Sequence, residues 1–173
     1  MRIIGIPGHV PQTSQRISTD AVRQALERAG ITYLVTIPET PYETLLRDLL
    51  HDSSIEIVQV CRESEGMGIC SGLTYGSKRA ALLCSFKGLY NSIDSLLGVA
   101  LRTEASFLLL ISEAGTSAAA ASDPERGQHS AALLKALEIP FSEVESTEGL
   151  SRIDEAVAQT ENGTQPVAVI LHW

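Results

Sequence analysis

Residues 62–92 read RESEGMGICSGLTYGSKRAALLCSFKGLYNS and decide the fold. With the apolar run 55–60 before it, this stretch predicts a strand, a helix over 63–75 and a second strand over 80–85. A helix between two strands is the βαβ unit of a parallel sheet. Glu63 then stands at the end of the first strand, and a Gly-Leu-Tyr-Asn turn (88–91) follows the second. Because open α/β sheets bind ligands at these strand ends, we expect two loops to converge on one crevice.

The same alternation of strand and helix continues through the rest of the chain. It predicts an α/β fold, a three-layer α/β/α domain with a six-stranded, mostly parallel sheet over residues 17–173, preceded by an N-terminal arm over 1–16. The Ala-rich segment 113–128, with Pro124 and Gly127, predicts a mobile loop. The expected helices cover 18–29, 42–50, 63–75, 90–103, 130–137 and 149–159, and the expected strands cover 31–37, 55–60, 80–85, 107–112, 141–144 and 167–171.

The composition excludes several classes of function. The chain has 173 residues, which fits one domain, and a net charge of −8 without a Lys/Arg cluster, so nucleic acid is not an expected partner. No apolar run is long enough to cross a bilayer and the N-terminus lacks a signal-peptide core, so we expect a soluble, cytoplasmic protein and no membrane partner. The cysteines, Cys61, Cys70 and Cys84, are odd in number and lack CxxC spacing, which indicates buried small side chains rather than disulfides or a metal site. The four histidines also lack the spacing of metal ligands.

The helix over 63–75 contains three glycines, Gly66, Gly68 and Gly72. Each costs about 1 kcal/mol of helix propensity relative to Ala, so a compensating interaction is expected. Small residues allow another backbone to come close, which predicts an interface helix or a helix that packs against a bound ring. Tight packing of the helix on the sheet is the alternative.

Two carboxylates, Glu63 and Glu65, lie in the first turn of this helix. Residues two apart on a helix are separated by about 200°, so only one of them can face the crevice. Favourable interaction with the helix dipole is the ordinary explanation for either carboxylate.

The segments ESEGMGICSG (63–72) and SFKGLYNSI (85–93) resemble the pyrimidine-binding domain of thiamine diphosphate (ThDP) enzymes. The similarity covers roughly residues 17–173 and is greatest to the sulfopyruvate decarboxylase α subunit and the N-terminal domain of phosphonopyruvate decarboxylase. In that family a glutamate stands nine residues before the Gly that ends a small-residue helix, and this position is Glu63. The chain departs from the family at Tyr90, where Gly is usual, and this puts the substrate in doubt more than the cofactor.

The resemblance implies a catalytic role for Glu63, whose carboxyl would hydrogen-bond N1′ of the aminopyrimidine of ThDP. It also implies cofactor contacts by Ser85, Gly88, Leu89 and Asn91. Weaker candidates for substrate contact, each with an ordinary structural role as the alternative, are Thr40, Lys87, Tyr90 and His129.

The chain lacks the Gly-Asp-Gly segment with which ThDP enzymes hold Mg²⁺ and the diphosphate. The resemblance therefore implies that a separate PP-domain β subunit, carrying Gly-Asp-Gly and a later Asn, completes the site. We expect a homodimer of this chain within a larger α/β heteromer, acting on a small 2-oxo acid.

Two other functions remain open at this point. One is a non-catalytic binding or regulatory module that keeps the pyrimidine-binding fold. The other is a flavodoxin-like or nucleotide-binding domain, which is less favoured because TIPETP (36–41), not a Gly-rich phosphate loop, follows the first strand.

Overall fold

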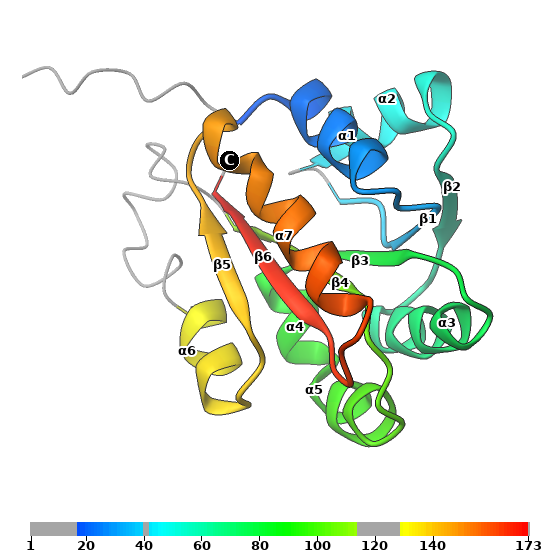
Figure 1. Ribbon diagram of the computed structural model, residues 1–173, viewed down its shortest axis with the longest axis vertical. Helices are drawn as coiled ribbons and strands as arrows, with labels where there is room; N and C mark the ends of the chain where they lie inside the picture. Colours follow the sequence, from blue (N-terminus) through cyan, green and yellow to red (C-terminus); the bar gives the residue numbers. More distant parts are fainter. Residues whose placement is uncertain (1–16, 40–41, 114–128, 173) are drawn as a thin grey trace, which may run out of the picture.

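The computed structural model describes residues 17–39, 42–113 and 129–172. All six strands of its sheet are parallel, in the order β2-β1-β3-β4-β6-β5, with helices on both faces (Figure 1). The three-layer α/β/α prediction is therefore confirmed. The strands are β1 (Tyr33–Thr36), β2 (Glu56–Gln59), β3 (Ala80–Ser85), β4 (Leu108–Glu113), β5 (Phe141–Val144) and β6 (Val167–His172). The helices are α1 (Thr19–Arg28), α2 (Glu43–Asp52), α3 (Glu63–Tyr75), α4 (Phe86–Asn91), α5 (Ile93–Ser95), the π-helix η2 (Leu96–Leu101), α6 (His129–Ala136), the 3₁₀-helix η3 (Thr147–Leu150) and α7 (Ser151–Thr160).

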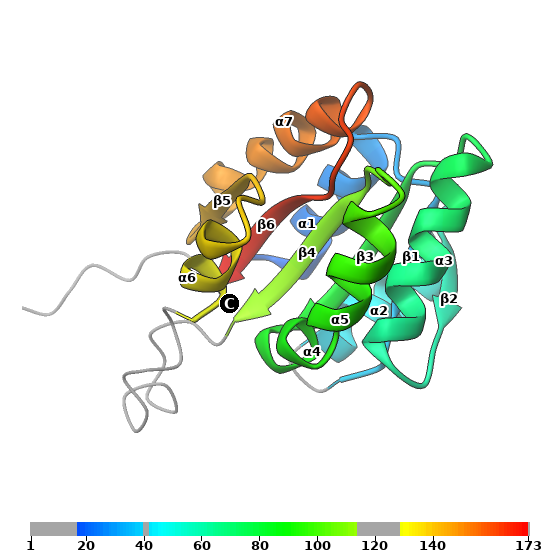
Figure 2. The same cartoon turned by 90° about the horizontal axis from the view of Figure 1, so that it is seen from below.

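The sheet separates two hydrophobic cores. Apolar side chains of α1, α2 and α7 cover one face, and those of α3, α4, η2 and α6 cover the other. Figure 2 shows α3, α4 and α5 on the opposite side of the strands from α7. Strands β3 and β4 are buried along their whole length, which explains their continuous apolar sequences.

The ends of the helices follow their local sequence. Ser18 caps α1 by accepting a hydrogen bond from Ala21 N, and Gly30 (φ 75°) follows the same helix in the left-handed region. Helix α3 ends at Gly76, its C-cap, which has φ −78°, and the next residue, Ser77, has φ 56°. The amide of Lys78 bonds to Leu73 O, so the Ser77 conformation completes the cap.

Three local predictions need correction. The segment 88–91 is not a turn, because it lies within helix α4, which spans Phe86–Asn91. The single helix expected over 90–103 is instead divided among α4, α5 and η2. Glu113 is the buried last residue of β4 rather than the first residue of a loop. Residues 1–16 and 114–128 lie outside the described residues, so the predicted arm and mobile loop stay predictions.

Within the described ranges, no helix is long and apolar enough to cross a membrane.

Candidate functional site

Glu63 is the first residue of α3 and follows the carboxyl end of β2. Its side chain is buried, with the residue 8% exposed. Among the described residues no hydrogen bond or ion pair is made to its carboxyl group. Its carboxyl oxygens are not among the fully buried side-chain atoms that lack a partner, so they can still be reached by water or a ligand.

Glu65 has a different role. Its Oε2 accepts hydrogen bonds from the amides of Cys61 (3.0 Å) and Arg62 (3.3 Å), which closes the N-terminus of α3 in a capping box. Glu65 is exposed, whereas Glu63 is buried. The prediction that only one of the two carboxylates faces the crevice agrees with this arrangement.

Helix α4 forms the wall beside Glu63. A methyl group at Gly88 would lie 2.6 Å from Glu63 Cδ, so the carboxyl group rests directly on the α4 backbone. Ser85 caps this helix, its Oγ accepting from Gly88 N at 3.3 Å, and Ser92 Oγ donates to Gly88 O at 2.8 Å. Gly88 and Leu89 are buried, so the structure brings three predicted cofactor residues together: Ser85, Gly88 and Leu89.

The remaining predicted residues lie further out. Lys87 and Asn91 are exposed on α4. Tyr90 is 43% exposed, and its hydroxyl donates to the backbone oxygen of His129 at 3.3 Å, which links α4 to the start of α6. Tyr90 and His129 are therefore neighbours at the same edge of the sheet. Thr40 lies outside the described residues.

Sequence reasoning missed Glu39. Its Oε1 accepts a hydrogen bond from Ser85 Oγ at 3.2 Å, which brings the end of β1 into the site. The available signal was its place at the end of a strand that pairs with β3, the same position that made Glu63 a candidate.

The cysteines near the site are not reactive groups. Burial raises the pKa values of the Cys70 and Cys84 thiols, and the nearby charges of Glu63 and Glu39 raise that of Cys84 further. Both thiols are neutral parts of the core. The prediction was wrong for Cys61, which is exposed. Over the described ranges, no three His, Cys, Asp or Glu side chains are grouped to hold a metal ion.

The glycines of α3 face two different environments. A methyl group at Gly66 would lie 2.6 Å from Leu82 Cδ1, so Gly66 permits tight packing of the helix on the sheet. At Gly68 and Gly72 a methyl group would meet nothing within 4 Å. Close packing within the chain therefore explains one glycine and leaves two on an open face.

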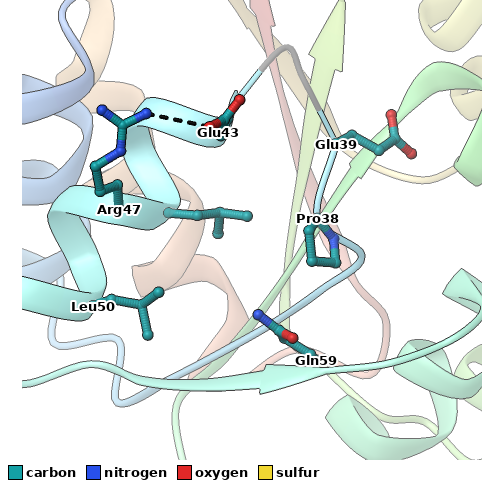
Figure 3. A pocket seen from close by; sticks show the side chains of 7 residues that line it. Pro38, Glu39, Glu43, Arg47, Leu50 and Gln59 are labelled. Atoms are coloured by element: carbon teal, nitrogen blue, oxygen red, sulfur yellow. Dashed lines mark hydrogen bonds and ion pairs between the residues drawn. The ribbon is translucent and has the colours of Figure 1, made fainter.

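A cavity of about 390 Å³ lies between α2 and the ends of β1 and β2. Figure 3 shows Arg47, Leu50 and Gln59 around it. Glu39 also lines this cavity but directs its carboxyl group away from Arg47 and Leu50.

The geometry suits the binding of a planar, hydrogen-bonding ring. A buried carboxyl group can exchange a hydrogen bond with a ring nitrogen, and the missing side chain at Gly88 lets the Glu63 carboxyl group lie directly against α4.

Comparison with known proteins identifies relatives of this chain and solved structures with a similar fold. No protein-family model matches the chain. It is 31% identical, over 89% of its length and 93% of the relative's, to "Sulfopyruvate decarboxylase subunit alpha" of Methanococcus maripaludis. The fold matches benzoylformate decarboxylase from Polynucleobacter necessarius, with a TM-score of 0.69 and 20% identity over 91% of this chain and 30% of the other. It also matches an enzyme from Mycobacterium smegmatis described as thiamin diphosphate-dependent, with a TM-score of 0.71 and 19% identity over 91% of this chain and 31% of the other. The identity to the Methanococcus protein over nearly the full length of both shows that this chain belongs to the family of sulfopyruvate decarboxylase α subunits.

Proposed function

We propose that this chain is the α subunit of a ThDP-dependent decarboxylase acting on sulfopyruvate or a similar 2-oxo acid such as phosphonopyruvate. The observation that carries the proposal is the buried Glu63 carboxyl group, which rests on Gly88 and has no partner among the described residues. The family membership supports this reading over a non-catalytic module.

The residues of the site fit the aminopyrimidine end of ThDP. Glu63 would hydrogen-bond a ring nitrogen, Gly88 would let the Glu63 carboxyl group lie against α4, and Ser85 and Leu89 would complete the niche with Asn91 at its rim. When bound, ThDP supplies the electron sink that allows CO₂ to leave a 2-oxo acid. The chain's own contribution is to orient the ring and to hold a proton at the Glu63 carboxyl group.

The substrate end of the site is proposed to lie along α4 and α6. Lys87 would attract the anionic head group of the substrate. Tyr90, whose hydroxyl bonds to the backbone of His129, would narrow the entrance. Thr40 stays a candidate for substrate contact.

The diphosphate and Mg²⁺ would be held by a separate β subunit. The outward face of the α3 and η2 layer supports such an interface, because it exposes large apolar side chains that a free surface seldom groups together. The same layer carries Gly68, Gly72 and Gly98, where added methyl groups would meet open space. Since α3 begins at Glu63, a partner on this face would also reach the cofactor. The exposed apolar residues are Ile69, Tyr75, Leu97 and Val99. The homodimer and the cytoplasmic location stay predictions.

The test is reconstitution of the chain with its β subunit, ThDP and Mg²⁺, followed by CO₂ release from sulfopyruvate and phosphonopyruvate. Glu63→Gln should lower kcat by ~100-fold or more, as expected for loss of a group that exchanges a proton with the reacting system. Glu65→Gln is the matched control and should keep most of the activity, because Gln also completes a capping box. Equal losses would contradict the role of Glu63, and a wild-type complex without turnover would contradict the function.

A further inference from the structure

Glu39 is a second carboxylate at the same site, and neither the family resemblance nor the comparisons assign it a role. It stands at the end of β1, which lies next to β3 in the sheet. Its hydrogen bond from Ser85 Oγ joins positions 46 residues apart in the chain. This carboxyl group is therefore built into the wall of the site by tertiary structure.

A chain of hydrogen bonds connects Glu39 to the backbone next to Glu63. The amide of Gly88 donates to Ser85 Oγ at 3.3 Å, and Ser85 Oγ donates to Glu39 Oε1 at 3.2 Å. A hydroxyl group that donates to a carboxylate keeps its lone pairs free to accept, so ionised Glu39 orients Ser85 as the cap of α4. Because Gly88 lies against Glu63, the position of α4 determines the shape of the Glu63 niche.

The charges around Glu39 couple it to the same two functional candidates. Burial raises the pKa of Glu39 above its usual value of 4.5, the hydrogen bond from Ser85 lowers it, the charge of Glu63 raises it, and the charge of Lys87 lowers it. The other titratable groups near Glu39 are Tyr42 and Cys84, whose pKa values are raised by burial. Glu43 and Arg47 also line the cavity, but the Glu39 carboxyl group points away from Arg47 (Figure 3).

We propose, on the basis of the function given above, that Glu39 is a positioning residue: its ionised carboxylate orients Ser85 and so sets helix α4 against Glu63. Protonation of Glu39 weakens this acceptor and gives the carboxyl group an O–H that can donate to Ser85 Oγ, in competition with the amide of Gly88. The alignment is present when Glu39 is ionised and is lost as the pH falls through its pKa.

The coupling is tested on the full chain without cofactor or partner. Carboxyl-carbon NMR of glutamate-labelled protein gives the titration midpoint of Glu39, identified by the signal that disappears in Glu39→Gln. We expect a midpoint above 4.5 in the wild type. It should fall in Glu63→Gln, rise in Lys87→Gln and Ser85→Ala, and stay unchanged in the matched control Glu43→Gln. A midpoint that does not respond to Glu63→Gln overturns the proposal.

The catalytic consequence is tested in the complex with the β subunit, ThDP and Mg²⁺. Glu39→Gln retains an oxygen acceptor but cannot titrate, so the acid limb of the kcat–pH profile should move to lower pH while kcat near neutrality is largely kept. Glu39→Met removes the acceptor and should lower kcat by ~10- to 100-fold at every pH, the scale expected when a reacting group is misplaced. An unchanged acid limb in Glu39→Gln, or wild-type kcat in Glu39→Met, contradicts the positioning role.

Failure of the proposed function has a separate signature. If the wild-type complex neither binds ThDP nor releases CO₂, the assigned reaction is wrong. The NMR titration of the free chain then decides by itself whether Glu39, Ser85 and Glu63 are coupled.

Discussion

Glu63 and Glu113 are buried carboxylates at the carboxyl edge of one parallel sheet, but their surroundings differ. Oε1 of Glu113, a residue only 1% exposed, accepts a hydrogen bond from Ser130 N at 3.3 Å, and its Oε2 lies 3.8 Å from His172 Nδ1. His172 in turn contacts Glu143 Oε2 at 3.0 Å through Nε2. Glu63 rests on the backbone of Gly88, and no described residue makes a hydrogen bond or ion pair with its carboxyl group.

The difference separates structural from functional carboxylates. Paired Glu113 joins β4 to the start of α6 and to β6, so its burial is compensated within the fold. No described residue pairs with Glu63, and its place in the first turn of α3 lets the helix dipole stabilise its charge. A carboxyl group whose hydrogen-bonding capacity is not used within the fold is available to a hydrogen-bonding ligand.

The largest expected effect comes from closing the space beside Glu63. In Gly88→Ala the new methyl group would lie 2.6 Å from Glu63 Cδ and 2.7 Å from its Cγ, so the carboxylate must move. We expect activity of the reconstituted complex to fall by ~100-fold, because such a displacement misaligns the reacting groups. ThDP binding and CO₂ release measure the effect.

Gly76→Ala is the matched control, because the nearest atom to a methyl group there is Leu73 O at 3.4 Å. It should behave as wild type. Full activity in Gly88→Ala would show that Glu63 does not depend on the space beside α4.

The next effect sharpens the contrast between the two carboxylates. Glu113→Gln replaces a charge-assisted acceptor in the core and weakens the contact with His172, so the free energy of unfolding should fall by about 1–3 kcal/mol. Glu63→Gln breaks no described contact and should change it by less than about 0.5 kcal/mol. Urea denaturation of the full chain at pH 7 measures both variants. The reverse order would mean that Glu63 is the structural carboxylate.

Much of the fold follows directly from the sequence, but the site follows only in part. Apolar runs such as 107–112 have both faces buried, so their pattern alone identifies the central strands. Helix α4 was missed because six residues containing Gly88 have little intrinsic helix propensity, and Ser85 as its N-cap was the usable signal. The hydrogen bond between Ser85 and Glu39 depends on the pairing of β1 with β3, which local sequence does not specify.

The glycines of α3 are a second example of what the sequence alone does not specify. Sequence identifies three costly residues but not the rotation of the helix on the sheet. That rotation directs Gly66 to Leu82 and Val35 and leaves Gly68 and Gly72 facing outward. The face of α3 that lies on the sheet is therefore closely packed, and the face with Gly68 and Gly72 is open.

A third variant tests the face of α3 that packs on the sheet. In Gly66→Ala the methyl group would lie 2.6 Å from Leu82 Cδ1 and 3.4 Å from Val35 Cγ1. Overpacking of this kind costs about 1–3 kcal/mol, from which the better helix propensity of Ala removes about 1 kcal/mol. We expect a net loss of stability in urea denaturation. A stabilised variant would show that the packing of α3 on β3 is loose.

The smallest effect is expected on the open face of α3, and it should have opposite signs in two assays. Gly72→Ala meets no atom within 4 Å, so the free chain should gain up to about 1 kcal/mol of stability from helix propensity. If the β subunit packs on this face, the same methyl group should weaken the complex, measured as a higher Kd with the purified β subunit. Gly76→Ala, just beyond the end of α3, serves as the control and should leave that Kd unchanged. A stabilised chain with unchanged Kd would place the interface elsewhere, because the open space at Gly72 would then have no occupant in the complex.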